Sequence, residues 1–511
     1  MAILHTTTEY GAVAGLPAGN CRISVFKGIP YAAPPTGALR WREPQPPKPW
    51  TGDYPAYTFP AMGMQFRQMP GSFYEKENCV NHLPISEDCL YLNIWTPAEN
   101  VNERLPVAIW IHGGGFRTGT GHASLFDGEC YAKRGIVFVS FNYRLNGFGF
   151  MAHKELSVES EHGVSGNYGM LDQIAALKWV RRNITFFGGD PERITIFGQS
   201  SGAMSVQTLV TSPLTKGDIQ GAIMQSAGGL GVSTQRMTRT LEEAERQGAD
   251  FLKHIGISSI AEARRQSSQW LCDQFAKSDS VFNMQMYFAP NVDGYVLPKA
   301  VNDAVRAGWH HNIPYIVGST RNENWKTFNQ NIDYDAFKKD AQSLYGDFTE
   351  QFLQVVGANV PENILACKRN EFADHMYAGA AAFCEMQERH SRRPSYQYLF
   401  SQPAPGDDSG AFHGCEHAYV FQTLLRSWRP YSGEDYELSS RICEYWSNFI
   451  KTGNPNSDGI PEWIPYTEES PCAMEFGRYN TMFPFLGSRI AQFQKAFFLK
   501  DYNQIDALLG N

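Results

Sequence analysis

Residues 194–202 read Ile194-Thr-Ile-Phe-Gly-Gln-Ser-Ser-Gly202, and this stretch decides the fold. Residues 194–197 have the apolar, β-branched pattern of a buried strand, and residues 202–209 have a helical pattern. Glycines two positions before and after Ser200 permit a sharp, strained turn that pushes the serine hydroxyl out of the sheet. A strand, such a turn and a helix in that order predict a nucleophile elbow with Ser200 as the nucleophile.

Outward from this turn, strands and helices alternate along the chain. Segments 107–111 and 136–141 are near-continuous apolar runs, as expected of strands buried on both faces of a mostly parallel sheet. Residues 169–182 carry apolar side chains at every third or fourth position, which predicts an amphipathic helix. Further strands are expected at 222–224, 313–317 and 396–400, and a further helix at 438–449. This alternation predicts an α/β fold.

The length of 511 residues suits one large domain or several smaller ones. The sequence contains no repeat, low-complexity tract or Gly/Ser linker. From about 231 to 394 its apolar pattern is mainly helical. We therefore expect a single domain over 1–511, with helical insertions at approximately 231–288 and 331–394 over the active site.

Composition argues against several classes of function. The chain has 44 basic and 52 acidic residues without a long run of one sign, so nucleic acid is not an expected partner. Its apolar runs are shorter than the roughly 18 residues of a membrane helix, and the first ten residues lack a secretion-signal pattern, so no membrane partner is expected. Ten cysteines without a Cys-x-x-Cys pair argue against structural zinc and predict free thiols in the cytoplasm.

The run His112-Gly-Gly-Gly-Phe116 directly follows the expected strand 107–111. Three successive glycines let main-chain amides approach a reacting carbonyl, and together with the N–H of Ser201 they predict an oxyanion hole. The alternatives are a flexible glycine turn or a phosphate cradle. The second lacks the Lys-Ser/Thr that ends a Walker motif.

Five motifs together resemble the type-B carboxylesterase family, which includes bacterial para-nitrobenzyl esterases, mammalian carboxylesterases and cholinesterases. The resemblance runs from about residue 20 to the C-terminus and implies an α/β-hydrolase fold, with a large, mostly parallel central sheet flanked by helices. It also implies a triad whose acid is Glu, with no metal and no cofactor. The motifs are Ser86-Glu-Asp-Cys-Leu-Tyr-Leu-Asn-Ile-Trp95, the His112 glycine run, Gly166-Asn-Tyr-Gly-Met-Leu-Asp-Gln173, Phe187-Gly-Gly-Asp-Pro191 and the Ser200 elbow.

The resemblance implies an acid downstream of the serine, followed by a histidine. Glu323 lies in a segment similar to the family's Gly-x-x-x-Asp-Glu-Gly motif, from which Asn322 and Asn324 depart. Asp293 is the spare candidate, although its Pro-x-x-Asp-Gly segment is structural in this family. Glu323 is therefore the expected acid.

His413 is the expected base, because Gly410-Ala-Phe-His-Gly-Cys-Glu-His417 is similar to the family's His-Gly-x-Glu segment. His417 is its near rival. In the expected mechanism, His413 takes the proton of Ser200 while Glu323 orients the imidazole. The resulting oxyanion is held by the backbone N–H groups of Gly114, Gly115 and Ser201.

Two alternative functions remain open from the sequence. The same fold serves non-catalytic adhesion domains that have lost triad residues, whereas this chain has a complete set. The pattern His413-x-x-Glu416-His417 also satisfies the His-x-x-Glu-His signature of zinc peptidases. Gly414 weakens a helix there by about 1 kcal/mol relative to alanine, and a zinc site would leave Ser200 unexplained.

The resemblance also concerns the substrate, a small-molecule ester. Cholinesterases bind a cation against a tryptophan ten residues before the Cys89 position, where this chain has Cys79, and against a glutamate where it has Gln199. Neutral esters are therefore expected, and a disulfide of Cys89 would use Cys79 or not exist. Met286 and Phe288 resemble the family's acyl-pocket segment, with ordinary core packing as the alternative.

Overall fold

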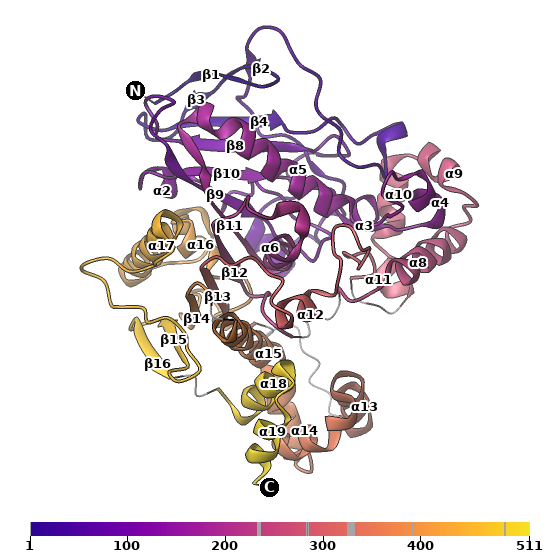
Figure 1. The fold of residues 1–511 in the computed structure, drawn as a ribbon, viewed down its shortest axis with the longest axis vertical. Coiled ribbons are helices and arrows are strands. Elements are labelled where there is room, and N and C mark those ends of the chain that lie inside the picture. The colour runs from indigo at the N-terminus through magenta and orange to yellow at the C-terminus, as the bar shows by residue number, and fades with distance from the viewer. Residues whose placement is uncertain are drawn as a thin grey trace.

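The computed structural model describes residues 2–510 apart from 232–236, 283, 285, 324–332, 391 and 485–486. Its centre is an 11-stranded sheet (Figure 1). The strands in spatial order are β16 (Thr481–Pro484), β15 (Cys472–Phe476), β14 (Ser395–Phe400), β13 (Tyr315–Thr320), β12 (Gly221–Gln225), β11 (Gly189–Gln199), β9 (Leu105–Ile111), β10 (Val137–Phe141), β8 (Tyr91–Thr96), β4 (Ser24–Pro30) and β3 (Leu16–Pro17).

All neighbours from β15 to β10 run parallel, and only the outer strands β16, β8, β4 and β3 pair antiparallel. The mostly parallel sheet predicted from the sequence is therefore confirmed. The strand starts differ from the prediction by one to five residues. β13 begins at Tyr315 rather than at residue 313, after Pro314, which has no N–H for the ladder. β11 begins at Gly189, five residues before the expected residue 194, with a register shift before Ile194.

Helices cover both faces of this sheet (Figure 1). Ile109 of β9 faces a core shared with α5 (Tyr168–Asn183) and α6 (Ser201–Thr211). The next residue, Trp110, faces the opposite core, which is shared with α2 (Glu129–Ala132) and α17 (Gly433–Thr452). Successive strand residues point to opposite faces, so an unbroken apolar run fills two cores at once.

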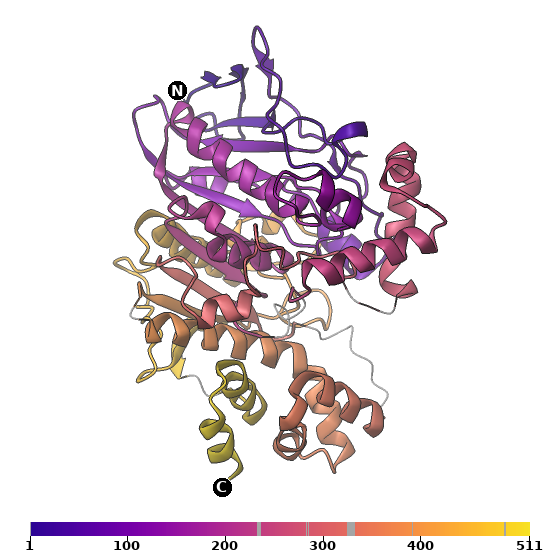
Figure 2. The same ribbon diagram turned by 45° about the vertical axis from the view of Figure 1, so that its right-hand side comes forward.

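Two groups of helices extend beyond the sheet and lie apart from each other (Figure 2). The first group falls in the expected insertion 231–288 and comprises α8 (Leu241–His254), α9 (Ile260–Arg265), α10 (Ser268–Phe275) and α11 (Ser278–Val281). In the second group, α13 (Tyr334–Tyr345) and α14 (Thr349–Val356) share a small core with the C-terminal helices α18 (Arg489–Leu499) and α19 (Tyr502–Leu509). Helix α15 (Pro361–Arg389) contacts β13 and β14, so the expected insertion 331–394 combines a helical extension with a sheet-covering helix.

The remaining elements are short. Two small sheets lie in the N-terminal region. They contain β1 (His5–Thr8), β2 (Gly11–Ala14) and β5 (Tyr54–Pro55), and β6 (Met62–Gly63) with β7 (Ile85–Ser86). The other helices are α1 (Phe73–Asn78), α3 (Asn146–Phe150), α4 (Lys154–Glu159), α12 (Val301–Arg306) and α16 (His417–Val420).

All ten cysteines lie in the described part of the chain, and each is a free thiol. Cys79 is exposed and Cys89 is buried, so the disulfide left open by the sequence does not form between them. Among the described residues, no helix has the length and apolar character needed to cross a membrane.

Candidate active site

Ser200 occupies the turn between β11 and α6 with φ 58° and ψ −130°. This backbone conformation is sparsely populated for any residue except glycine and costs about 1–3 kcal/mol. The N–H of Ser200 donates to the carbonyl of Gln225 at 2.9 Å, which anchors the turn on the neighbouring strand β12. A Cβ at Gly198 would lie 2.6 Å from the backbone of Gly202, and one at Gly202 would lie 2.1 Å from the Ile111 carbonyl. Both flanking glycines are therefore required by close backbone approach.

The glycine loop that follows β9 lies against this turn. Gly114 has φ 109°, and its carbonyl accepts hydrogen bonds from the N–H groups of Arg117 and Thr118, both at 3.1 Å. The N–H of Phe116 donates to Ser201 Oγ at 3.2 Å and so ties the loop to the start of α6. The loop is held by its own backbone and by the helix that carries the nucleophile.

Three backbone N–H groups in this arrangement are candidate donors of an oxyanion hole. Ser201 is the first residue of α6, so its N–H has no partner within the helix. The N–H groups of Gly114 and Gly115 have no hydrogen-bond partner among the described residues. All three residues line one cavity together with Ser200. The structure thus brings the predicted donors together at the serine.

His413 and Glu323 form a hydrogen-bonded pair beside the elbow. His413 Nδ1 donates to Glu323 Oε2, and Glu323 Oε1 accepts the N–H of Thr320 at 2.8 Å. Burial of the ring favours its neutral form, but the charge of Glu323 and this hydrogen bond outweigh burial and raise the pKa of His413 above its usual value. Glu323 is itself buried, so its carboxylate depends on these donors for stabilisation.

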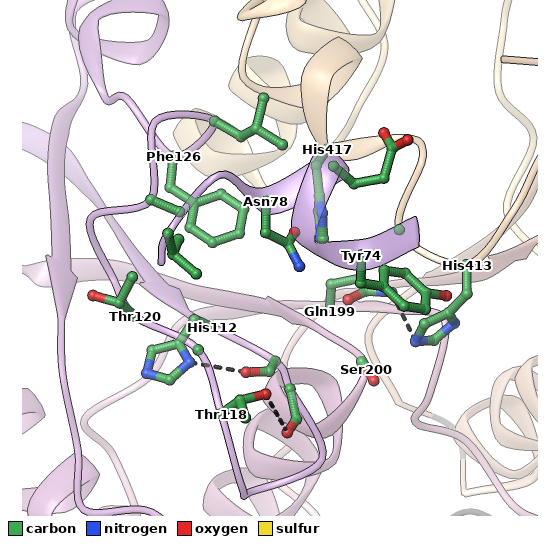
Figure 3. Close-up of a pocket in the computed structure, with 18 of the residues that line it drawn as sticks. Tyr74, Asn78, His112, Thr118, Thr120, Phe126, Gln199, Ser200, His413 and His417 are labelled. Carbon is green, nitrogen blue, oxygen red and sulfur yellow. Dashed lines mark hydrogen bonds between the residues drawn. The ribbon is translucent and has the colours of Figure 1, made fainter. Parts of the chain in front are cut away.

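The other ring nitrogen of His413 faces the nucleophile's neighbour. Gln199 Nε2 donates to His413 Nε2 at 3.2 Å, while Ser200 lies between this pair and the glycine loop (Figure 3). Both Ser200 and His413 line the same cavity. Catalytic hydrogen bonds are often loose before substrate binds, so this geometry is compatible with transfer of the serine proton to Nε2.

Asp293, the second candidate for the acid, makes its hydrogen bonds away from His413. Its Oδ1 accepts the N–H groups of three residues that follow it, Tyr295, Val296 and Leu297, and its Oδ2 accepts from Asn167 Nδ2 at 2.8 Å. It therefore organises its own loop, whereas Glu323 contacts the candidate base.

The zinc-peptidase pattern does not form one helix face. Helix α16 begins only at His417, and Gly414 has φ 88°, outside helical geometry. Burial and the charge of His413 lower the pKa of His417 to about 3, so it stays neutral, packed edge-on against Trp110. Across the described ranges, no group of three potential metal ligands occurs.

Glu416 is a buried carboxyl that the sequence marked only as a member of the His-Gly-x-Glu and His-x-x-Glu-His patterns. Ser226 Oγ donates to Glu416 Oε1 at 3.4 Å. Burial, and after it the charge of Glu323, raises the pKa of Glu416 to about 7. The charge of Glu416 in turn contributes to the raised pKa of His413. The position of Glu416 just after His413 and Gly414 was the signal in the sequence that its charge could act on His413.

Two cavities meet at Ser200. One, of about 250 Å³, contains His413, the candidate base. A base at this place would protonate a departing alcohol, so we call it the alcohol-side cavity. The other, of about 430 Å³, contains the three candidate oxyanion donors, and we call it the acyl-side cavity. The described lining of the acyl-side cavity is Phe66, Gly114, Gly115, Arg117, Thr118, Ser200, Ser201, Met204, Ala227, Asp279, Met286, Phe372 and Met376.

The two predicted acyl-pocket residues have different places. Met286 lines the acyl-side cavity. Phe288 does not belong to the described lining of either cavity; it is buried, with its ring 5.1 Å from Phe251 and 5.2 Å from Phe275. Core packing, the alternative left open by the sequence, therefore describes Phe288. Asn324, the second departure from the family's acid motif, lies outside the described residues.

The sequence of the chain is similar to those of known esterases over most of its length. The model of the carboxylesterase family matches residues 3–494. The chain is similar to fumonisin B1 esterase of Sphingopyxis macrogoltabida, with 34% identity over 92% of this chain and 86% of that protein. It is equally similar to para-nitrobenzyl esterase of Bacillus subtilis (strain 168), with 34% identity over 91% and 93% of the two chains.

Human cocaine esterase is 32% identical over 91% of this chain and 86% of its own length. Among solved structures, that of a thermophilic PNB esterase superposes with a TM-score of 0.83 at 30% identity. The superposition covers 96% of this chain and 99% of that one. The predicted α/β-hydrolase fold is confirmed.

Proposed function

Because the chain belongs to the carboxylesterase family and is a carboxylic ester hydrolase, we propose that Ser200 is its nucleophile, His413 its general base and acid, and Glu323 its orienting acid. The observation that carries this proposal is the hydrogen bond between His413 Nδ1 and buried Glu323, formed beside the strained Ser200 turn. A non-catalytic adhesion domain has no need of this pair, and the similar proteins are named as esterases.

The mechanism follows from the geometry. Neutral His413 turns its Nε2 from Gln199 to the Ser200 hydroxyl and takes the proton as the oxygen attacks the ester carbonyl. The N–H groups of Gly114, Gly115 and Ser201 stabilise the tetrahedral oxyanion, each by about 3 kcal/mol in comparable sites. His413 then protonates the leaving alcohol, and water repeats the sequence to release the acid.

Labelling with a fluorophosphonate probe tests the nucleophile directly. We expect one label per chain on Ser200 by mass spectrometry, no label in Ser200→Ala, and ester turnover lowered there by several orders of magnitude. Ser201→Ala is the matched control, because it removes the adjacent hydroxyl but retains the backbone donor. Stoichiometric labelling elsewhere, or Ser200→Ala keeping more than about a tenth of kcat, would contradict the assignment.

We propose that the alcohol group of the substrate carries no positive charge. The described lining of the alcohol-side cavity contains no tryptophan, and its one carboxylate, Glu77, is bound by the buried guanidinium of Arg429 at 2.8 Å. Matched butyrate esters of choline and of a neutral alcohol test this. We expect kcat/KM for the choline ester to be lower, because a quaternary ammonium loses hydration in this cavity without gaining a free carboxylate. Equal values would refute it.

Three further proposals concern the partners, the domain organisation and the compartment of the protein. The substrate is a small molecule, and neither nucleic acid nor a membrane is a partner. Residues 1–511 form one domain whose helical insertions approach the active site. The cysteine pattern favours the cytoplasm as the compartment. Size-exclusion and limited proteolysis of the full chain would test the domain proposal, with a single resistant fragment as the expected result.

A further inference from the structure

The described lining of the acyl-side cavity contains one guanidinium, that of Arg117, and one carboxylate, that of Asp279. Arg117 is the only Lys or Arg among the described residues that line either cavity at Ser200. It lies two residues after Gly115, so its backbone belongs to the glycine loop. The walls of the same cavity are formed mainly by Met204, Ala227, Met286, Phe372 and Met376. A charged group among such side chains requires a partner or a ligand.

Asp279 of α11 is the partner that orients Arg117, although the two residues are 162 positions apart. Its Oδ2 accepts from Arg117 Nη1 at 2.6 Å and from the N–H of Met286 at 3.1 Å. Its Oδ1 accepts the N–H of Tyr287 at 2.9 Å. Three donors therefore already stabilise this carboxylate, and it fixes the guanidinium in one direction.

The guanidinium of Arg117 keeps further donors. Only Nη1 has a hydrogen-bond partner among the described residues, whereas a guanidinium carries five N–H groups in a planar fork. Its guanidinium carbon lies over the ring of Phe66, 5.0 Å from the ring centre. About a third of the side chain remains exposed, and Arg117 lines the cavity. The remaining edge matches the geometry of a carboxylate.

We propose that the acyl-side cavity binds an acyl chain that ends in a carboxylate held by Arg117, so that half-esters of dicarboxylic acids are substrates. This inference rests on the proposed function of Ser200 and names the acyl group of its substrate. Hydrolysis adds water across the ester C–O bond and yields the free dicarboxylate and the alcohol. The three flexible methionine side chains suit the methylene chain between the two carboxyl groups.

The experiment compares two esters of one alcohol. The first is a half-ester of succinate, glutarate or adipate, and the second is the neutral ester of the same length with a methyl group in place of the carboxylate. The quantity measured is the ratio of their kcat/KM values. In Arg117→Gln we expect this ratio to fall by about 10-fold or more, as for loss of a hydrogen bond to a charged group.

Asp279→Asn supplies the opposing variant. It removes the negative charge nearest the guanidinium, so the ratio should rise rather than fall. A purely structural clamp between Arg117 and Asp279 predicts that both variants lower both activities and leave the ratio unchanged, and that result would overturn the proposal. Arg104→Gln is the matched control, since Arg104 pairs with Asp190 at 2.7 Å away from both cavities.

The outcomes also separate this inference from the proposed function. Turnover of the neutral ester by the wild type, lost in Ser200→Ala, supports the nucleophile whatever the ratio is. A wild-type ratio that never rises above about one-hundredth for any chain length would overturn the carboxylate proposal alone. A fall of this ratio in high salt, with turnover of the neutral ester retained, would support the carboxylate proposal, because salt screens an exposed ion pair.

Discussion

The serine side and the histidine side of the proposed active site are stabilised by different interactions. On the serine side, the turn at Ser200 and the loop at Gly114 are held by backbone hydrogen bonds and by close packing that only glycine permits. On the histidine side, His413 is hydrogen-bonded to the buried carboxylate of Glu323, and the charges of Glu323 and Glu416 raise its pKa. The first region fixes positions, and the second sets a proton affinity.

This difference separates two ways of losing activity. A change on the serine side moves or removes a donor, so it lowers the rate by the same factor at every pH. A change to the charges on the histidine side shifts the pH at which the base becomes neutral. The pH profile therefore identifies the side on which a variant acts.

Replacing His413, the proposed base, is expected to have the largest effect. In His413→Ala, kcat falls by about 10⁴-fold or more, because members of a triad act as a unit. His417→Ala is the control: this ring is neutral and packs against Trp110 and Phe126, so we expect a loss of less than about 10-fold. Activity of both variants and of the wild type should be insensitive to EDTA. Loss of activity in EDTA with recovery on addition of zinc would contradict the proposed role of His413 as a metal-independent base.

A change in the glycine loop is expected to come next. In Gly114→Ala the new Cβ would lie 2.1 Å from the Thr118 carbonyl, so the loop must move and one oxyanion donor is lost. We expect kcat to fall by about 100-fold with an unchanged pH midpoint. Gly115→Ala meets open space at φ 64° and should lose less. A shifted midpoint in Gly114→Ala would show that the two sides are not independent.

The wild-type pH profile provides the next test. His413 must be neutral to accept a proton, and its pKa is raised, so kcat/KM should rise with pH through a midpoint above about 6.5. Activity is lost as pH falls through that value because the ring becomes protonated. A midpoint below about 6 would mean that burial outweighs the charge of Glu323.

The smallest effect is expected from Glu416. Its charge helps to raise the pKa of His413, so Glu416→Gln should move the midpoint of kcat/KM to lower pH, with little change of the plateau. Glu350→Gln is the control, because Glu350 is exposed on α14. A lowered plateau at an unchanged midpoint would assign Glu416 a packing role only.

The fold was predictable where its signals are local. The turn at Ser200 is encoded within nine residues, and the central strands are encoded by apolar runs that fill both cores. The predicted helix at 438–449 extends to Gly433–Thr452, because Ser432 and Asp435 form a capping box and Gly453 ends the helix in a left-handed conformation. Those caps were present in the sequence and mark its true bounds.

The cavity walls were less predictable because they depend on distant segments. Met286 and Phe288 lie two positions apart in an irregular segment, and only the packing of α8 and α10 directs Phe288 into the core beside Phe251 and Phe275. The pairing of Arg117 with Asp279 likewise requires α11 to return to the glycine loop. No local periodicity encodes such a contact.

The strained backbone of Ser200 lowers the stability of the fold at the residue that the proposed activity requires. Glycine, which has no Cβ, adopts φ 58° and ψ −130° without the penalty that serine carries. The same replacement removes the hydroxyl that the proposed chemistry requires. Stability and activity therefore favour different residues at this turn, and a Ser200→Gly variant is expected to combine lost ester turnover with a higher melting temperature.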